Sequence, residues 1–251
     1  MENRTDNDLL YLCLKFAKTE DRAKSVMNGK LYGNDPEYFR NREKETGERG
    51  QGDANELVLV QEGFNLAFIS DGKPFFKSQN ATAKIRYRED DTKTMVSFIG
   101  LSLNDLEFHG YENGQEVYKL PFTDEDYEYF SSTFGAHCVV IHGPSLQDML
   151  KKYEETTGIK VTFGKVKYYP KNSMERAERF ASLTDDRFFL KDSEFAAQRE
   201  YRAFFDMNLP ENHIVNIGSL RHCSTYLEIK DLKKYKYASD SLTKMHNMDK
   251  H

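Results

Sequence analysis

Short runs of apolar and aromatic residues, separated by polar turns, alternate along the whole chain. Residues 9–16 (LLYLCLKF), 95–101 and 137–142 (HCVVIH) are apolar runs of the length expected for buried strands. Residues 161–169 and 198–205 alternate polar with apolar side chains, as a strand with one exposed face does. We therefore expect strands at all five places.

Capping residues mark where helices begin between these strands. Thr19, followed by two acidic residues, predicts the start of a helix that ends at Gly29. Pro36 suits the first turn of a second helix. Thr123 and Ser145 each stand before a helical pattern, which predicts two further helices running to about Phe130 and Thr156.

Strands and helices are intermixed along the chain without regular βαβ alternation. Further strands are expected at 57–60, 66–69, 83–88 and 115–120, between glycine- and aspartate-rich turns, and residues 171–194 have a broken helical pattern. This order favours an α+β fold with short helices and a mixed, mostly antiparallel sheet. No linker interrupts the chain, so we expect a single domain over residues 1–251, with frayed ends at about 1–8 and 239–251.

Residues 41–56 (NREKETGERGQGDANE) are polar and glycine-rich, with almost nothing apolar to bury. They predict a surface loop of a length that is usually functional or mobile. Its glycines let backbone amides approach a ligand, and Arg49 suits a phosphate. Asp53 and Glu56 would equally suit a cation, and a plain flexible loop is the alternative.

Composition excludes several classes of protein. The 251 residues carry a net charge of −5, which disfavours a globally basic nucleic-acid binder. The three cysteines lack metal or disulfide spacing, and no signal peptide or membrane span is evident, so a cytoplasmic protein that does not enter a membrane is expected. No Rossmann, P-loop, HExxH or GxSxG motif occurs.

Gln198 and Glu200 are the sharpest candidates for chemistry. On a strand, residues two apart face the same side, so the two side chains would lie together. A glutamate can stabilise an oxocarbenium-like centre at an anomeric carbon, and a neighbouring glutamine can orient the nucleophile. A charged strand exposed on one face is the alternative interpretation of this short pattern.

Three blocks of sequence, in this order, resemble a family of phage- and mobile-element-encoded domains, some of which are ADP-ribosyltransferase-like toxins of anti-phage defence. The first block is MNGKLY at 27–32 with YFR at 38–40 and the loop at 49–56; the second is FGAHCVVI at 134–141 with the strand around 164–168; the third is FLK at 189–191 with QREYR at 198–202.

The resemblance implies an ADP-ribosyltransferase-like fold, NAD as substrate and no metal. It makes Glu200 the catalytic residue and Gln198 the residue that positions the nucleophile. Lys15 stands where the family's first strand often carries an arginine or histidine that contacts the ribose or the phosphates. The other cofactor-binding candidates are Arg40 and Arg49 for phosphate, Ser102 (with Ser97 also available) for NAD, and Tyr32 and Phe39 for ring stacking.

On this hypothesis the enzyme cleaves the nicotinamide–ribose bond and transfers ADP-ribose to RNA or protein in phage–host conflict, with an antitoxin or regulatory partner possible. Two other classes stay open. One is a non-enzymatic module that binds a partner through the acidic surface and residues 41–56. The other is a metal-dependent nuclease using Asp53 and Glu56.

Overall fold

The computed structural model describes residues 9–47, 52–182 and 184–238, and in it the chain divides into two compact units. The sheet unit contains residues up to Asn34, Thr94–Lys165 and residues from Arg199 onward. The hairpin unit contains Asp35–Lys93 and Val166–Gln198.

A six-stranded sheet forms the centre of the sheet unit. In spatial order its strands are β14 (Ser224–Glu228), β8 (His137–His142), β1 (Leu10–Ala17), β5 (Lys93–Ser102), β12 (Glu200–Asn208) and β9 (Val161–Lys165). β1 runs antiparallel to both of its neighbours, and the β8–β14 and β12–β9 pairs are antiparallel as well. The predicted α+β fold with mostly antiparallel pairing is therefore confirmed.

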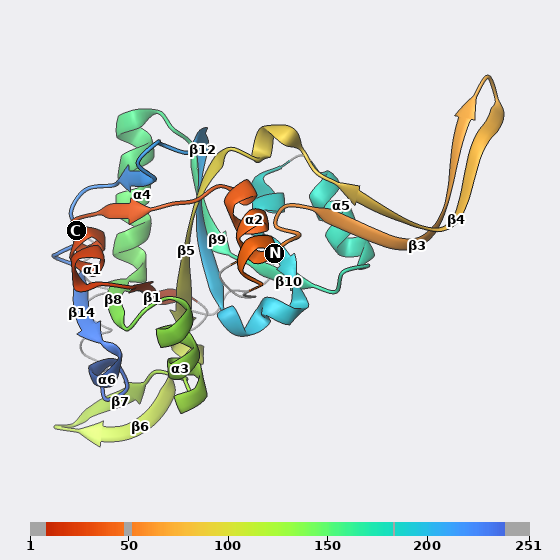
Figure 1. The fold of residues 1–251 in the computed structure, drawn as a ribbon. Coiled ribbons are helices and arrows are strands. Elements are labelled where there is room, and N and C mark those ends of the chain that lie inside the picture. The colour runs from red at the N-terminus through yellow and green to blue at the C-terminus, as the bar shows by residue number, and fades with distance from the viewer. Residues whose placement is uncertain (1–8, 48–51, 183, 239–251) are drawn as a thin grey trace. The chain divides into compact units, whose positions relative to one another are not determined.

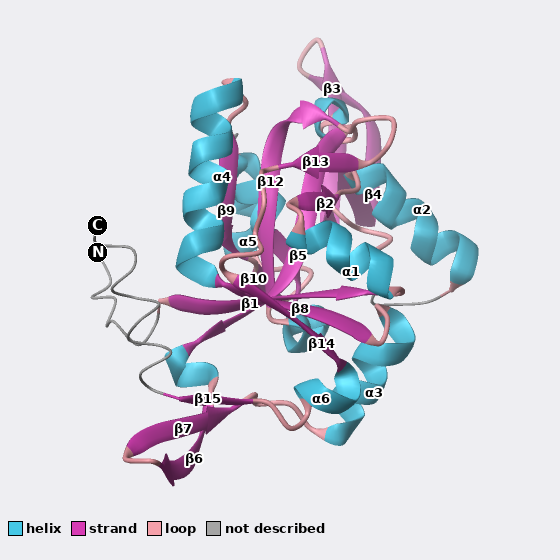
Figure 2. Ribbon diagram, turned by 90° about the vertical axis from the view of Figure 1, so that its left-hand side faces the viewer, coloured by secondary structure: helices cyan, strands magenta, loops and turns pink. Residues whose placement is uncertain are grey.

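Both faces of this sheet are covered, because its central strands are apolar on both sides. In β1, Cys13 packs into one core cluster and Leu14 into the other. The face of the first cluster is covered by α1 (Glu20–Met27), by α4 (Gly143–Thr157) and by the ribbon of β2 (Lys30–Tyr32) with β13 (Ile214–Asn216). The face of the second cluster is covered by α3 (Asp124–Thr133), by α6 (Ile229–Leu232) and by a small sheet. That sheet consists of β15 (Lys236–Ala238), β7 (Gln115–Lys119) and β6 (Glu107–Glu112). Figure 2 shows α1 and α4 on the side of β1 and β8 opposite to α3 and α6.

The hairpin unit is built around a long two-stranded ribbon. β3 (Leu59–Ser70) and β4 (Lys73–Ile85) pair antiparallel and extend away from α5 (Met174–Ala181) in Figure 1. Leu59, Phe180 and Leu190 form a small apolar core. The other elements are α2 (Pro36–Thr46), the parallel pair β10 (Lys167–Tyr169) and β11 (Leu190–Asp192), and the short 3₁₀ helices η2 (Arg88–Asp90), η4 (Asp185–Phe189) and η5 (Ser193–Gln198).

Local capping chemistry was the most reliable guide to where helices begin. The Thr19 side chain accepts from the amide of Arg22, and Thr123 forms a reciprocal capping box with Asp126. The expected start at Ser145 was wrong, because α4 begins two residues earlier, at Gly143. No helix among the described residues is long and apolar enough to cross a membrane.

Several boundaries differ from the sequence prediction. Residues 41–46, expected in a loop, continue α2 until Gly47 ends it with a left-handed φ of 66°. Residues 59–60 and 66–69 belong to one strand, β3, which runs through Gly63 at an irregular register. Leu57, expected to begin a strand, lies in a turn with a left-handed φ of 52°. Residues 161–169 form two strands, β9 and β10, which belong to different units. The expected frayed ends and residues 48–51 lie outside the described residues.

Candidate functional site

The expected strand face shared by Gln198 and Glu200 does not form. Gln198 ends the 3₁₀ helix η5, and Arg199 has a left-handed φ of 46°, so β12 begins only at Glu200. Two-residue alternation holds only within a continuous strand, and the left-handed residue interrupts it. Gln198 instead accepts a 2.8 Å hydrogen bond from the Lys191 amine, inside the hairpin unit.

Glu200 lies at the start of β12, and its carboxylate is buried. Its side chain is only 6% exposed. Arg202, two residues further along the strand and 1% exposed, donates from Nε to Glu200 Oε1 at 3.0 Å, and its Nη2 forms an ion pair with the same oxygen at 2.9 Å. The two residues share a strand face, so the ion pair follows directly from the spacing of Glu200 and Arg202. Charge-assisted bonds of this kind fix a carboxylate firmly in place.

Ser97, in the neighbouring strand β5, donates its hydroxyl to the same oxygen. The Ser97 Oγ to Glu200 Oε1 distance is 2.5 Å. The strand alternates strictly here, so that Val96 and Phe98 pack in one core cluster and Ile99 in the other. Ser97 is thus the single polar side chain between apolar neighbours in this part of β5, and it meets the carboxylate across adjacent strands.

Lys15, in β1, adds a positive charge next to this pair. Its amine donates to the Ser97 carbonyl at 2.6 Å and lies 5.3 Å from the centre of the Phe98 ring. Burial lowers the pKa of Lys15 to about 8, and the charge of Glu200 opposes part of that decrease. Lys15 thus bonds to the main chain of Ser97 from the neighbouring strand, while the hydroxyl of the same serine bonds to Glu200 on the other side. We call Lys15, Ser97, Glu200 and Arg202 the β1–β5–β12 cluster.

A glycine makes room beside this cluster. A Cβ built on Gly100 would lie 2.0 Å from the ring of Tyr201, so only glycine lets that ring pack across β5. The Gly100 amide donates to the carbonyl of Arg199 at 3.0 Å, which fixes the beginning of β12. Gly100 thus contributes to the placement of Glu200 without contacting it.

Two other candidates of the sheet unit have different roles. Ser102 is bonded to Asp105: its amide and hydroxyl both donate to Asp105 Oδ2, and together they cap a short 3₁₀ turn. Arg199 pairs with Asp105 at 2.5 Å. Tyr32 is 50% exposed and stacks on His213, with 5.2 Å between ring centres. No contact of the described structure brings Ser102 or Tyr32 to Glu200.

The candidates of the hairpin unit form a separate set of contacts. Arg40 is buried and donates to the Glu56 carbonyl and to Asp91 Oδ1, at 2.9 and 2.5 Å. This arrangement fastens the middle of α2 to the segments around Glu56 and Asp91. Phe39 is half-buried and packs edge-on against Tyr38. Arg49 lies outside the described residues.

Asp53 and Glu56 are both buried in the hairpin unit. Burial and the neighbouring charge of Glu56 raise the pKa of Asp53 to about 6, while Lys191 acts in the opposite direction. Among the residues that the structure describes, no three His, Cys, Asp or Glu side chains lie close enough together to hold a metal ion.

Sequence reasoning missed Arg202 as a member of the site and favoured Ser102 over Ser97. The spacing of Glu200 and Arg202 carried the signal for the first, because residues two apart on a strand share a face. No local signal distinguished the two serines, since the pairing of β5 with β12 decides which one meets the carboxylate. Comparison with models of protein families, with curated proteins and with solved structures found no match for this chain.

Proposed function

We propose that this protein is an NAD-dependent ADP-ribosyltransferase whose chemistry centres on the β1–β5–β12 cluster. The observation that carries the proposal is the bond from the Ser97 hydroxyl to the buried Glu200, with the amine of Lys15 bonded to the carbonyl of the same serine. The sequence resemblance implies the same three kinds of residue, namely a basic residue on the first strand, a middle serine and a late glutamate.

The chemistry of the cluster suits cleavage at an anomeric carbon. As the nicotinamide–ribose bond breaks, positive charge develops on the ribose, and a fixed carboxylate stabilises it. Glu200 supplies that carboxylate, and Ser97 holds it at one oxygen. Lys15 supplies a cation for the phosphates or the ribose hydroxyls of NAD. ADP-ribose then passes to a nucleophile on RNA or protein as nicotinamide leaves.

Arg202 acts in this proposal as a positioning residue. Its hydrogen-bonded ion pair with Glu200 holds the carboxylate before substrate arrives, which avoids reorganisation during the reaction. The ion pair with Arg202 occupies Oε1 of Glu200. Catalysis therefore requires that Glu200 contact the ribose while it remains bonded to Arg202.

The test is nicotinamide release from NAD, measured with candidate RNA and protein acceptors and with the wild type, Glu200→Gln and Ser97→Ala. We expect wild-type release, a loss of roughly a hundredfold or more in Glu200→Gln, and a smaller loss in Ser97→Ala. Glu228→Gln, an exposed glutamate of β14 that pairs with Lys230, is the matched control and should keep full activity.

Two results would contradict the proposal. One is the absence of nicotinamide release from the wild type with every acceptor. The other is equal release from the wild type and from Glu200→Gln, measured at a temperature at which both proteins are folded. Unfolding temperatures of both proteins with and without NAD separate lost binding from lost chemistry.

A second candidate function is a non-enzymatic module that binds a macromolecular partner. Two observations favour it: Glu200 is almost completely buried, and it pairs with Arg202. Both are typical of an ion pair that stabilises a sheet and contacts no ligand. On this alternative NAD leaves the unfolding temperature unchanged, and Glu200→Gln lowers stability without any effect on partner binding.

A further inference from the structure

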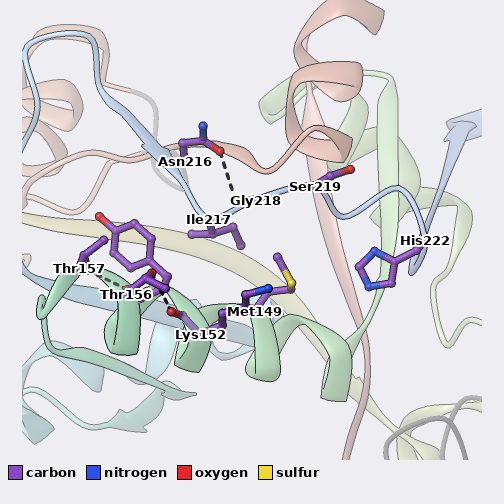
Figure 3. Close-up of a pocket in the computed structure, with 10 residues that line it drawn as sticks. Met149, Lys152, Thr156, Thr157, Asn216, Ile217, Gly218, Ser219 and His222 are labelled. Atoms are coloured by element: carbon purple, nitrogen blue, oxygen red, sulfur yellow. Dashed lines mark hydrogen bonds between the residues drawn. The ribbon is translucent and has the colours of Figure 1, made fainter.

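A hollow of about 500 Å³ lies in the sheet unit, between α4 and the segment that follows β13. Its volume falls in the range of small-molecule sites. Figure 3 shows side chains of α4 along one side, the 216–219 segment along the other and His222 at one end. None of the residues that line it belongs to the β1–β5–β12 cluster.

The rim of this hollow is preformed by backbone hydrogen bonds. The amide of Ile217 donates to the Gly29 carbonyl and the amide of Leu220 donates to the Met27 carbonyl, both at 2.9 Å. Gly218 adopts a left-handed φ of 89°, and a Cβ built on Gly29 would lie 1.6 Å from the Gly218 carbonyl oxygen. The end of α1 therefore fixes the 216–220 segment, and a ligand would bind without first ordering it.

Apolar atoms form the floor. Met149 projects from α4, and the buried Ile217 lies on the other side of the hollow. Tyr153 of α4 also lines the hollow. A Cβ on Gly218 would lie 2.9 Å from the Met149 methyl carbon, so that methyl group lies directly under the glycine. A thioether and an aromatic ring are suitable neighbours for a flat, partly apolar ligand group.

The two ionisable side chains that line the hollow and carry nitrogen are both basic. Lys152 and His222 line it, and none of the ten lining residues is an aspartate or a glutamate, although the chain as a whole has a net charge of −5. Within the described residues the amine of Lys152 has no hydrogen-bond or ion-pair partner, whereas that of the adjacent Lys151 lies 4.0 Å from Glu155. An amine beside an apolar floor with no carboxylate in the lining attracts an anion.

We propose that this hollow binds a small phosphorylated molecule with a flat ring, such as a mononucleotide. The phosphate contacts Lys152 and His222, and the ring lies over Met149, Tyr153 and Ile217. The Ser219 hydroxyl and the Asn216 amide line the rim and recognise polar groups of the ligand. This site is independent of the proposed transferase activity, because it shares no residue with the β1–β5–β12 cluster.

The test is a titration with adenosine 5′-monophosphate, followed by NMR of methionine methyl groups in the full chain. The Met149 signal, assigned with Met149→Leu, should shift with saturation in the millimolar range or below. Adenosine has the ring without the phosphate, and inorganic phosphate has no ring, so each should bind more weakly than the monophosphate. Lys152→Gln should weaken binding by roughly tenfold, since a charge-assisted bond is lost, and His222→Gln should weaken it less.

Lys151→Gln is the matched control, one residue away on the same helix and outside the lining, and should bind like the wild type. The proposal is overturned if Met149 does not respond, if adenosine shifts it as strongly as the monophosphate, or if Lys152→Gln and Lys151→Gln bind alike. Glu200→Gln should leave the titration unchanged, so failure of this site and failure of the transferase proposal give different results.

Discussion

Replacing Arg202 by methionine should lower the free energy of unfolding more than replacing an exposed residue of the same strand or of the residues next to it. Arg202 is 1% exposed, and it forms a hydrogen-bonded ion pair with the buried Glu200. Removing one partner of a buried ion pair leaves the other charge uncompensated, which costs about 3–5 kcal/mol. For a chain of this size, that loss lowers the unfolding temperature by roughly 6–20 °C.

The assay is urea unfolding, followed by both circular dichroism and tyrosine fluorescence so that two-state behaviour is checked. Arg199→Met is the matched control, because Arg199 pairs with Asp105 while remaining 38% exposed, and such pairs contribute about 0–1 kcal/mol. The double variant Glu200→Gln/Arg202→Met completes a mutant cycle.

We expect the double variant to be more stable than the sum of the two single changes predicts, because neither charge is then buried alone. The coupling should lie at about 1–3 kcal/mol. A loss below about 1 kcal/mol for Arg202→Met, or strict additivity in the cycle, would refute the reasoning that a buried ion pair holds this part of the sheet.

Two more predictions concern other buried features. Gly100→Ala should cost about 1–3 kcal/mol, because the new methyl would overlap the Tyr201 ring. In a Tyr201→Ala background the same change should cost much less, and an equal cost in both backgrounds would mean that another contact is responsible. Asp53→Asn should be more stable than the wild type at pH 7. The pKa of Asp53 is raised from 3.8 to about 6, so its ionised form is disfavoured in the folded state by roughly 3 kcal/mol. That penalty disappears as the pH falls from above 6 to below 3.8, and urea midpoints of the two proteins should therefore converge over this window; a constant difference would contradict the pKa assignment.

The sequence was informative wherever short-range chemistry decides structure. Thr19 and Thr123 cap the helices that they predicted, and the apolar runs at 9–16 and 137–142 became the buried strands β1 and β8. These features depend on residues within a few positions of one another, so a local pattern suffices. The same holds for the α+β class, which follows from the order of elements.

Long-range pairing was not visible in the same way. β1 lies between β5 and β8, and β12 lies beside β5, so neighbours in the sheet are distant along the chain. Ser97 meets Glu200 only because of that order, and Ser102, five residues further along, caps a turn instead. The left-handed Arg199 had no sequence signal either, since glycine and asparagine are the usual residues in that conformation.

The sequence by itself determined the class of fold, most helix starts and the presence of Glu200 as a candidate carboxylate. The tertiary structure decided that Glu200 is buried, that Ser97 and Arg202 hold it, and that Gln198 bonds to Lys191 elsewhere. The physical reason is that caps and strand periodicity act within one or two turns of chain, whereas a site in a sheet depends on which strands pair and in which register.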